Sequence, residues 1–304
     1  MESVDLAARL DCVGRTWSPL QRLHVGDVAW AHAHGDGSVP PDVTLAWGAP
    51  RTGFADVWLP ERTEAHATAS LHLAPQTMTP HELEKAVDEL LEAAPRVRMA
   101  VSLQQPELVD ALTSRGFRRL GGPWFVRLWR SLADVDDLAG HTVPDGYTIR
   151  HVRPEELVER VEVHRRCWAP ARIKRMLSLP VTGDEAGSSY SVDKHRAVMA
   201  TPVYRADLDL VAVAADGSFA AFGLGWLDAS AGAVLFEPIG TVPEHAGRGL
   251  ARAVCAEILR AARDHGATQA VVSPRGDDGY PLPRRLYEGL RMREVAQVVS
   301  FGTV

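Results

Sequence analysis

Hydrophobic and polar positions recur along the chain with two periods, one typical of strands and the other of amphipathic helices. In the second half, apolar and alternating runs predict strands over 147–152, 208–214, 219–227 and 233–241, followed by "ATQAVVS" and a final "EVAQVVSF". Asp216-Gly217 is a hairpin signal between two of these strands. Helices are predicted over 154–168, over 248–265 and around "PRRLYEGL", and the segment from the first helix to residue 206 has no regular period. The pattern predicts a mixed sheet with a few helices.

The first half repeats this order more weakly. "DVTLAWG", "TGFADVWL" and "TASLHL" are predicted strands, and "TPHELEKAVDELLEAA" is a predicted helix with Thr79 before it and Pro80 at its first position. "RVRMAVSL" then predicts a strand, "PELVDALTSRGF" a helix and "WFVRLWRS" a strand that closes the half. Both halves therefore run through strands, a long helix, a strand, a short helix and a strand. We interpret this as an internal duplication, with domains at 1–135 and 147–304 and a polar, acidic linker at 136–146.

Composition and charge narrow the class of protein. The 304 residues are 46% hydrophobic and 24% charged, as expected for a soluble globular protein of two ordinary domains. The net charge of -6 argues against nucleic acid as the main partner, although a local basic cluster could still bind a small polyphosphate. No apolar run approaches the roughly 20 residues of a membrane span. The acidic N-terminus does not resemble a signal peptide, and three distant cysteines suggest a reducing compartment, so a cytoplasmic location is predicted.

The stretch "TVPEHAGRGLARAV", residues 241–254, is the strongest candidate for a binding loop. Gly247, Gly249 and Ala251 are small where a helix begins, and helix N-termini bind anions through free N–H groups. A dinucleotide fingerprint needs a third glycine where Arg252 stands, and a nucleoside triphosphate loop needs Lys and Ser or Thr where Leu250 and Ala251 stand. Both of these interpretations fail on spacing. An ordinary tight turn between strand and helix remains the alternative.

A third pattern fits this stretch better. "AGRGLA", Ala246 to Ala251, resembles the (Gln/Arg)-x-x-Gly-x-(Gly/Ala) loop of the GNAT N-acetyltransferase superfamily, with Ala246 in place of the usual Gln or Arg. The resemblance covers about 147–304. It implies an α/β fold of two tandem GNAT-like domains, each a mostly antiparallel twisted sheet flanked by helices. It also implies acetyl-CoA as acyl donor, bound by Ile239, Gly240, Thr241, Ala246, Gly247, Arg248, Gly249, Leu250, Ala251 and Arg252. The first half lacks the glycine loop, which suggests a degenerate copy with a structural or acceptor-binding role.

Glu237 is the candidate general base. It lies in "AVLFEPIGTVP", an apolar stretch with no other charge, where loss of water raises the pKa of a carboxyl group towards neutrality. Pro238 cannot donate to a sheet and therefore marks a bulge or an edge. In the GNAT family this strand separates from its neighbour at a bulge, which implies that pantetheine pairs with Ile239 to Thr241. The alternative is that Glu237 is a structural acid at a strand end.

Tyr287 is the candidate general acid. "PRRLYEGLRMRE" resembles the family motif Leu-Tyr-x-x-x-Gly-Phe, with Arg291 and Met292 in place of Gly and Phe, and the resemblance implies that the Tyr287 hydroxyl reaches the CoA sulfur. The alternative is a tyrosine packed in the core. The asparagine that the family carries seven residues earlier is Tyr280 here. Three nearby arginines could instead reach the CoA 3′-phosphate or remain solvated: Arg275, Arg284 and Arg285.

Several other chemistries lack their motifs. The 12 histidines and three cysteines show no H-E-x-x-H or C-x-x-C spacing, so no metal site is predicted. No G-x-S-x-G elbow supplies an acyl-enzyme nucleophile, which favours direct attack. We therefore expect an N-acetyltransferase, monomer or homodimer, that acylates an amine of a small molecule, with neither nucleic acid nor membrane as partner.

Three alternatives stay open at this point. One is a catalytically silent CoA-binding sensor or scaffold, which the departures from the family motifs suggest. Another is acetylation of an aminated glycoside, because the tandem architecture resembles that of mycothiol synthase. A nucleotide-dependent oxidoreductase is disfavoured by the loop spacing. The irregular region over 178–209 is expected to shape recognition of the acceptor.

Overall fold

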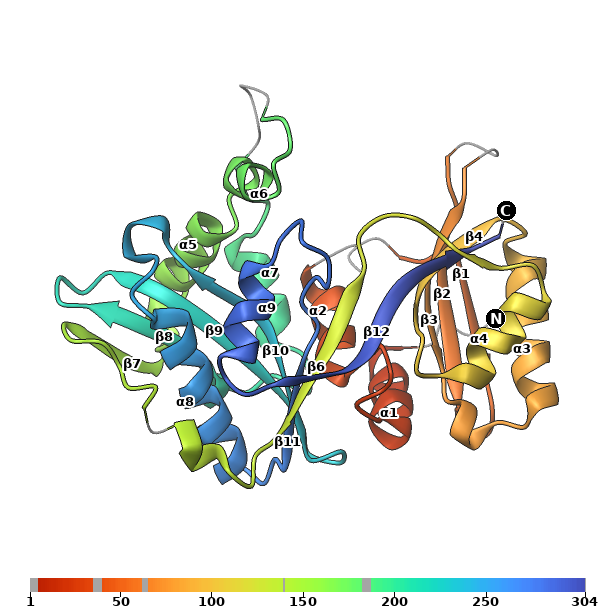
Figure 1. Cartoon of the computed structure of the whole chain (residues 1–304), viewed down its shortest axis with the longest axis horizontal. Helices are drawn as coiled ribbons and strands as arrows, with labels where there is room; N and C mark the ends of the chain where they lie inside the picture. The colour runs from red at the N-terminus through yellow and green to blue at the C-terminus, as the bar shows by residue number, and fades with distance from the viewer. Residues whose placement is uncertain (1–4, 35–39, 62–64, 139, 182–186, 304) are drawn as a thin grey trace.

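The computed structural model describes residues 5–34, 40–61, 65–138, 140–181 and 187–303 (Figure 1). The first half contains these helices and strands: α1 Leu6–Thr16, α2 Val25–His34, β1 Val43–Trp47, β2 Gly53–Trp58, β3 Ala67–Leu73, α3 Pro80–Ala93, β4 Val97–Ser102, α4 Pro106–Ser114, β5 Arg118–Arg119 and β6 Phe125–Ser131. The second half contains these: β7 Tyr147–His151, α5 Leu157–Cys167, α6 Pro170–Met176, α7 Val192–Met199, β8 Asp209–Ala214, β9 Phe219–Asp228, β10 Ala233–Thr241, α8 Leu250–Asp264, β11 Gln269–Val272, α9 Leu282–Glu288 and β12 Arg293–Gly302. Short 3-10 turns connect several of them, among them η3 at Val135–Leu138 and η6 at Pro243–His245.

The described strands form one 12-stranded mixed sheet that continues from one half into the other. Its order is β1-β2-β3-β4-β12-β6-β11-β10-β9-β8-β7, with β5 added beside β12. All pairs are antiparallel except β3 with β4 and β10 with β11. These two parallel pairs occupy equivalent positions, each before and after the long helix of its half. The predicted duplication and the mostly antiparallel mixed α/β architecture are therefore present.

The final strand of each half is exchanged. β6, at the end of the first half, pairs with β11 through Trp129 and Val271, whereas β12 crosses to pair with β4 through Val299 and Val101 (Figure 1). β6 and β12 also pair with each other in the middle of the sheet. The strand predicted at "WFVRLWRS" is therefore present as the last strand of the first half, but it pairs with strands of the second half. Two equivalent edges compete for two equivalent strands, and a local pattern of alternation cannot distinguish them.

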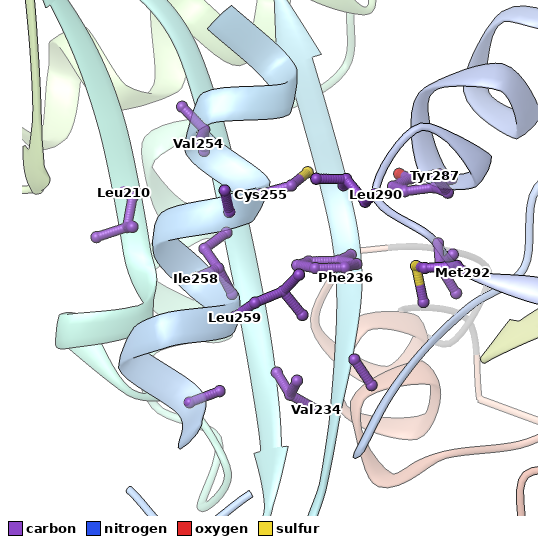
Figure 2. Packing of buried hydrophobic residues seen from close by; sticks show 14 of the residues in the cluster. Leu210, Val234, Phe236, Val254, Cys255, Ile258, Leu259, Tyr287, Leu290 and Met292 are labelled. Carbon is purple, nitrogen blue, oxygen red and sulfur yellow. The ribbon is translucent and has the colours of Figure 1, made fainter. Parts of the chain in front are cut away.

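The two faces of the second half are covered by different parts of the chain. α8 packs Val254 and Ile258 against Val234 and Phe236 on one face (Figure 2). The helices of the first 34 residues, α1 and α2, cover the other face. Their Val13, Val28 and Ala29 form one buried cluster with Trp226, Leu235 and Val271. α5 extends the same layer over Val211 and Phe222. Alternation along β10 therefore sends Leu235 and Phe236 to opposite faces.

Some elements have no counterpart in the sequence prediction. α1 and α2 were not predicted, and the segment to residue 206 contains the short helices α6 and α7, so its description as irregular is corrected. Helices of seven or eight residues are too short to show a period clearly. Within that segment, 182–186 lies outside the described residues. The predicted linker begins in η3, whose Val135 and Leu138 are buried in the core beside α8.

Candidate active site

The sheet opens between β10 and β11. These two strands pair only from Ala233 with Gln269 to Leu235 with Val271, whereas β10 stays paired with β9 as far as Thr241. The β9–β10 register shifts between Phe236 and Ile239, which places a bulge at Glu237 and Pro238. Beyond Leu235, the β11-facing edge of β10 carries no strand among the described residues, so its backbone groups are available to a ligand.

A cavity of about 780 Å³ lies in this opening. It is lined by the second part of β10, the loop and first turn of α8, the end of β11, the loop before α9, α9 itself and the α5–α6 segment. β6 contributes Phe125. The equivalent opening in the first half, between β3 and β4, holds a cavity of only about 10 Å³, which is lined by Gln21, Arg22, His72 and Gln105 among others.

The start of α8 is shaped to accept an anion. Gly249 is the N-cap with φ of +82°, and Gly247 has φ of +78°, a conformation that glycine adopts without strain. No side chain caps the helix, so its first N–H groups have no partner of that kind. A Cβ atom added at either glycine would meet nothing within 4 Å, so space for a ligand remains around this backbone.

α3, the corresponding helix of the first half, begins differently. The Thr79 hydroxyl accepts from the Glu82 N–H at 3.2 Å, and the Glu82 carboxylate accepts from the Thr79 N–H at 2.7 Å. This capping box occupies the N–H groups and puts a negative charge at the helix N-terminus. A pyrophosphate would meet both a filled site and a like charge there.

Glu237 lies at the bulge, half-buried and facing the cavity. Burial, and to a smaller extent the charge of Asp27, raise the pKa of its carboxyl group to about 8, although the charge of Arg127 acts in the opposite direction. The Glu237 carbonyl accepts a hydrogen bond of 2.6 Å from the Trp226 indole N–H, which holds the backbone of the bulge. The carboxyl group is thus placed to take up a proton near neutral pH.

Tyr287 lines the same cavity from α9 and is 6% exposed. Its ring stacks on that of Phe236, with centroids 5.9 Å apart and planes at 11°, in the layer that also contains Cys255 of α8 (Figure 2). Burial, together with Cys255 and Glu237, raises the pKa of Tyr287 well above its ordinary value. The phenol therefore stays protonated and can act as a donor. Tyr287 is therefore packed in the core and also lines the cavity.

The cavity carries an excess of positive charge. Arg172, Arg252, Arg275 and Arg285 line it, beside Glu237. Arg275 is held by Asp277 at 2.6 Å, and Arg172 donates to the Cys167 carbonyl at 2.5 Å. Arg284, in contrast, is not among the lining residues and pairs with Glu288 and Glu294.

The residues predicted to bind the donor converge here with one exception. The cavity is lined by Ile239, Gly240, Thr241, Ala246, Gly247, Gly249, Leu250, Ala251 and Arg252. The Arg248 side chain instead turns outward and donates to the Tyr147 hydroxyl at 3.0 Å. Sequence reasoning missed Phe125, Arg172 and Met176 as lining residues. Phe125 reaches the cavity on the exchanged strand β6. Met176 reaches it from α6, and its sulfur lies 3.9 Å from the Tyr280 hydroxyl. The sequence around Phe125 or Met176 does not indicate either position.

Two further observations bear on the class of site. Among the described residues, no three His, Cys, Asp or Glu side chains are grouped so that they could hold a metal ion. No helix in the described part of the chain is both long and apolar enough to cross a membrane. The side chain of His34, in the "HAH" sequence, lies outside the described part.

In its fold, the chain is similar over nearly its whole length to solved GNAT proteins, one of which is a tandem GNAT protein. A tandem GNAT protein from the clavulanic acid biosynthesis pathway is similar with a TM-score of 0.60 and 16% identity, covering 98% of this chain and 94% of that one. FemX is similar with a TM-score of 0.64 and 10% identity, covering 100% and 97%. A GCN5-related N-acetyltransferase from Sphaerobacter thermophilus is similar at 0.55 and 16%, covering 99% and 92%. No family model and no curated protein matches the sequence.

Proposed function

We propose that the protein is an acyltransferase that moves the acetyl group of acetyl-CoA to an amine of a small molecule. One observation carries this proposal: the open edge of β10, the uncapped start of α8, Glu237 and Tyr287 all border one cavity. The first half has a much smaller cavity and a capped helix at the equivalent place, so we place the proposed active site in the second half. The first half then has a supporting role.

The cavity fits the acyl donor in three respects. The free N–H groups around Gly247 and Gly249 suit a pyrophosphate, and the surrounding space admits it without collision. The unpaired edge of β10 from Ile239 to Thr241 suits the amides of a pantetheine arm, which can pair as a strand would. Arg252 and Arg285 add positive charge for the remaining phosphate.

The proposed reaction uses the residues of the bulge and of α9. Glu237 takes a proton from the acceptor amine, directly or through a water molecule. A backbone N–H near Ile239 polarises the thioester carbonyl. The amine nitrogen bonds to the carbonyl carbon, the carbon–sulfur bond breaks, and Tyr287 protonates the sulfur that leaves.

Direct attack is favoured over an acyl-enzyme. Cys167 is the cysteine that lines the cavity, and it is buried against Gly240 of β10. Burial raises the pKa of its thiol to about 12, so little thiolate exists at neutral pH. A thiol in this state is a poor nucleophile.

The test is release of free thiol from acetyl-CoA with a panel of amines that includes amino acids, polyamines and aminated glycosides. Glu237→Gln and Tyr287→Phe are each expected to slow turnover by about 100-fold or more, as for the loss of a general base or acid. Glu294→Gln is the control, because this acid pairs with Arg284 and is not among the residues that line the cavity. Its rate should stay near that of the unaltered protein.

Calorimetry with CoA separates the enzyme from the silent sensor. Saturable binding together with no thiol release on any amine would establish a sensor or scaffold and overturn the proposed activity. Bound nicotinamide dinucleotide in the purified protein would instead favour the oxidoreductase alternative.

A further inference from the structure

Two charged residues of the first half, Asp27 and Arg127, lie near enough to Glu237 for their charges to act on it. Across β10, β11 and β6, Leu235, Val271 and Trp129 are aligned by strand pairing. Two residues further along, β10 has left β11 at the bulge of Glu237, whereas β6 stays beside the end of β11, where Val126 donates to the Pro274 carbonyl. Alternation along β6 sends Arg127 to the face of Trp129, which α2 covers, and there it contacts Gln21 and Asp27. The charges of Arg127 and Asp27 act on the carboxyl group of Glu237 at the bulge.

Arg127 is an unusual residue for this position. Its side chain is 0% exposed, and its Nη2 donates to the Gln21 carbonyl at 3.0 Å and also to the Arg22 carbonyl. Its Nε and Nη1 find no hydrogen-bond partner among the described residues. A buried guanidinium that is only partly satisfied is costly, so a nearby negative charge is strongly attracted to it.

Asp27 supplies part of that negative charge. Its Oδ2 lies 3.7 Å from the Arg127 Nη2, and the same oxygen accepts from the His24 N–H at 2.7 Å. This second bond fixes the carboxylate at the first turn of α2. The Arg127 guanidinium thus pairs with Asp27, and its charge also acts on the carboxyl group of Glu237.

We propose that Arg127 and Asp27 are positioning residues that keep Glu237 in the state of a base. The inference rests on the proposed function, in which Glu237 removes the proton from the amine. Asp27 pairs with the Arg127 guanidinium and so offsets part of its charge. Glu237 is therefore not held permanently ionised by Arg127. Arg127 in turn keeps the two carboxyl groups from repelling each other. The first half thus completes the active site through an exchanged strand and an N-terminal helix.

Removal of either charge is expected to shift the pKa of Glu237 in a definite direction. Without the charge of Asp27, the full charge of Arg127 acts on Glu237, and the pKa of Glu237 falls. Without the charge of Arg127, Glu237 faces Asp27 alone, and the pKa of Glu237 rises. A residue that only stabilised the fold would not move this pKa in opposite directions.

Other titratable groups near Glu237 are accounted for. His24 is buried beside Asp27, and burial lowers the pKa of its imidazole to about 4, so it is neutral near pH 8. Arg22 lies in the same turn and is present in every variant proposed below. Tyr287 faces Glu237 from α9 and stays protonated in this range.

The experiment is a carbon-13 NMR titration of glutamate carboxyl groups in the full chain, with Glu237→Gln used to assign the Glu237 resonance. Asp27→Asn is expected to lower the Glu237 midpoint by about one pH unit, and Arg127→Met to raise it by a similar amount. Asn keeps the acceptor oxygen for the His24 N–H. Arg127→Lys keeps the charge and should restore a midpoint near that of the unaltered protein.

The control is Asp136→Asn, an exposed acid paired with Arg263 far along the chain from the cavity. Its titration should match that of the unaltered protein. An unchanged Glu237 midpoint in Asp27→Asn, or shifts of the same sign in Asp27→Asn and Arg127→Met, would overturn the inference. If Arg127→Met does not fold, Asp27→Asn alone decides. The titration needs no turnover, so opposite shifts without any thiol release would sustain this inference while the proposed activity fails.

Discussion

Glu237 is a carboxyl group in an apolar strand, at the point where that strand separates from its neighbour. The bulge turns it towards the cavity, and burial raises its pKa to about 8. Tyr287, opposite, has its pKa raised as well. Burial thus favours the uncharged form of both groups. The raised pKa makes the Glu237 carboxylate a stronger base, and it keeps the Tyr287 phenol protonated and able to donate.

The pH dependence of kcat/KM follows from Glu237. Below about pH 8 the carboxyl group is protonated in most molecules, so the rate should rise about tenfold for each pH unit and level off above that value. The measurement is kcat/KM for the amine from pH 6 to 9.5 at saturating acetyl-CoA. In Glu237→Gln this rising limb should vanish. A limb near pH 4.5 would show instead that the carboxyl group is solvated.

α8 and α3 are equivalent helices of the two halves, but their N-termini are capped differently. Gly249 leaves the start of α8 open, whereas Thr79 and Glu82 close the start of α3 with a capping box. The two halves also differ in volume at the split, about 780 Å³ against about 10 Å³. One duplicated element therefore favours ligand binding and the other favours stability.

Gly249→Ala tests the open start of α8, and Gly217→Ala is its matched control. Both glycines have φ near +80° and empty space around a new Cβ, but Gly217 lies in the β8–β9 hairpin away from the cavity. Each change should lower the free energy of unfolding by about 1 kcal/mol. Only Gly249→Ala should also raise KM for acetyl-CoA, on the order of tenfold, because its Cβ occupies the phosphate approach. Equal KM values in both variants would argue against the loop as the donor site.

The whole molecule depends on the exchange of β6 and β12. Without β6, the edge of β11 is open, and without β4, one side of β12 has no strand. Open edges of this kind favour aggregation. The domain boundary predicted at 136–146 stays a prediction, because one continuous sheet contains strands from both sides of it.

Residues 140–304 expressed alone are therefore expected to be insoluble or to lack a cooperative thermal transition. Co-expression with residues 1–139 should restore a soluble complex, because β6 and β4 then return to their places. Solubility, circular dichroism and size-exclusion chromatography report the outcome. A monomeric, cooperatively folded 140–304 fragment would show that the exchange is dispensable.

The local sequence was enough to predict most of the helices and strands of the second half. The periods of β8, β9, β10 and α8, the glycines at 247 and 249, and an acid inside an apolar strand are all properties of short segments. The order of elements in the two halves was visible for the same reason. The role of each candidate residue remains a prediction.

The partners of these segments were decided by the tertiary structure. Asp27 and Arg127 lie far from Glu237 in sequence, and they approach it only because α2 covers this face and β6 replaces the strand that its own half would have supplied. Phe125 enters the cavity for the same reason. Alternation states which face a side chain occupies, but pairing between equivalent edges depends on long-range contacts that no short segment encodes.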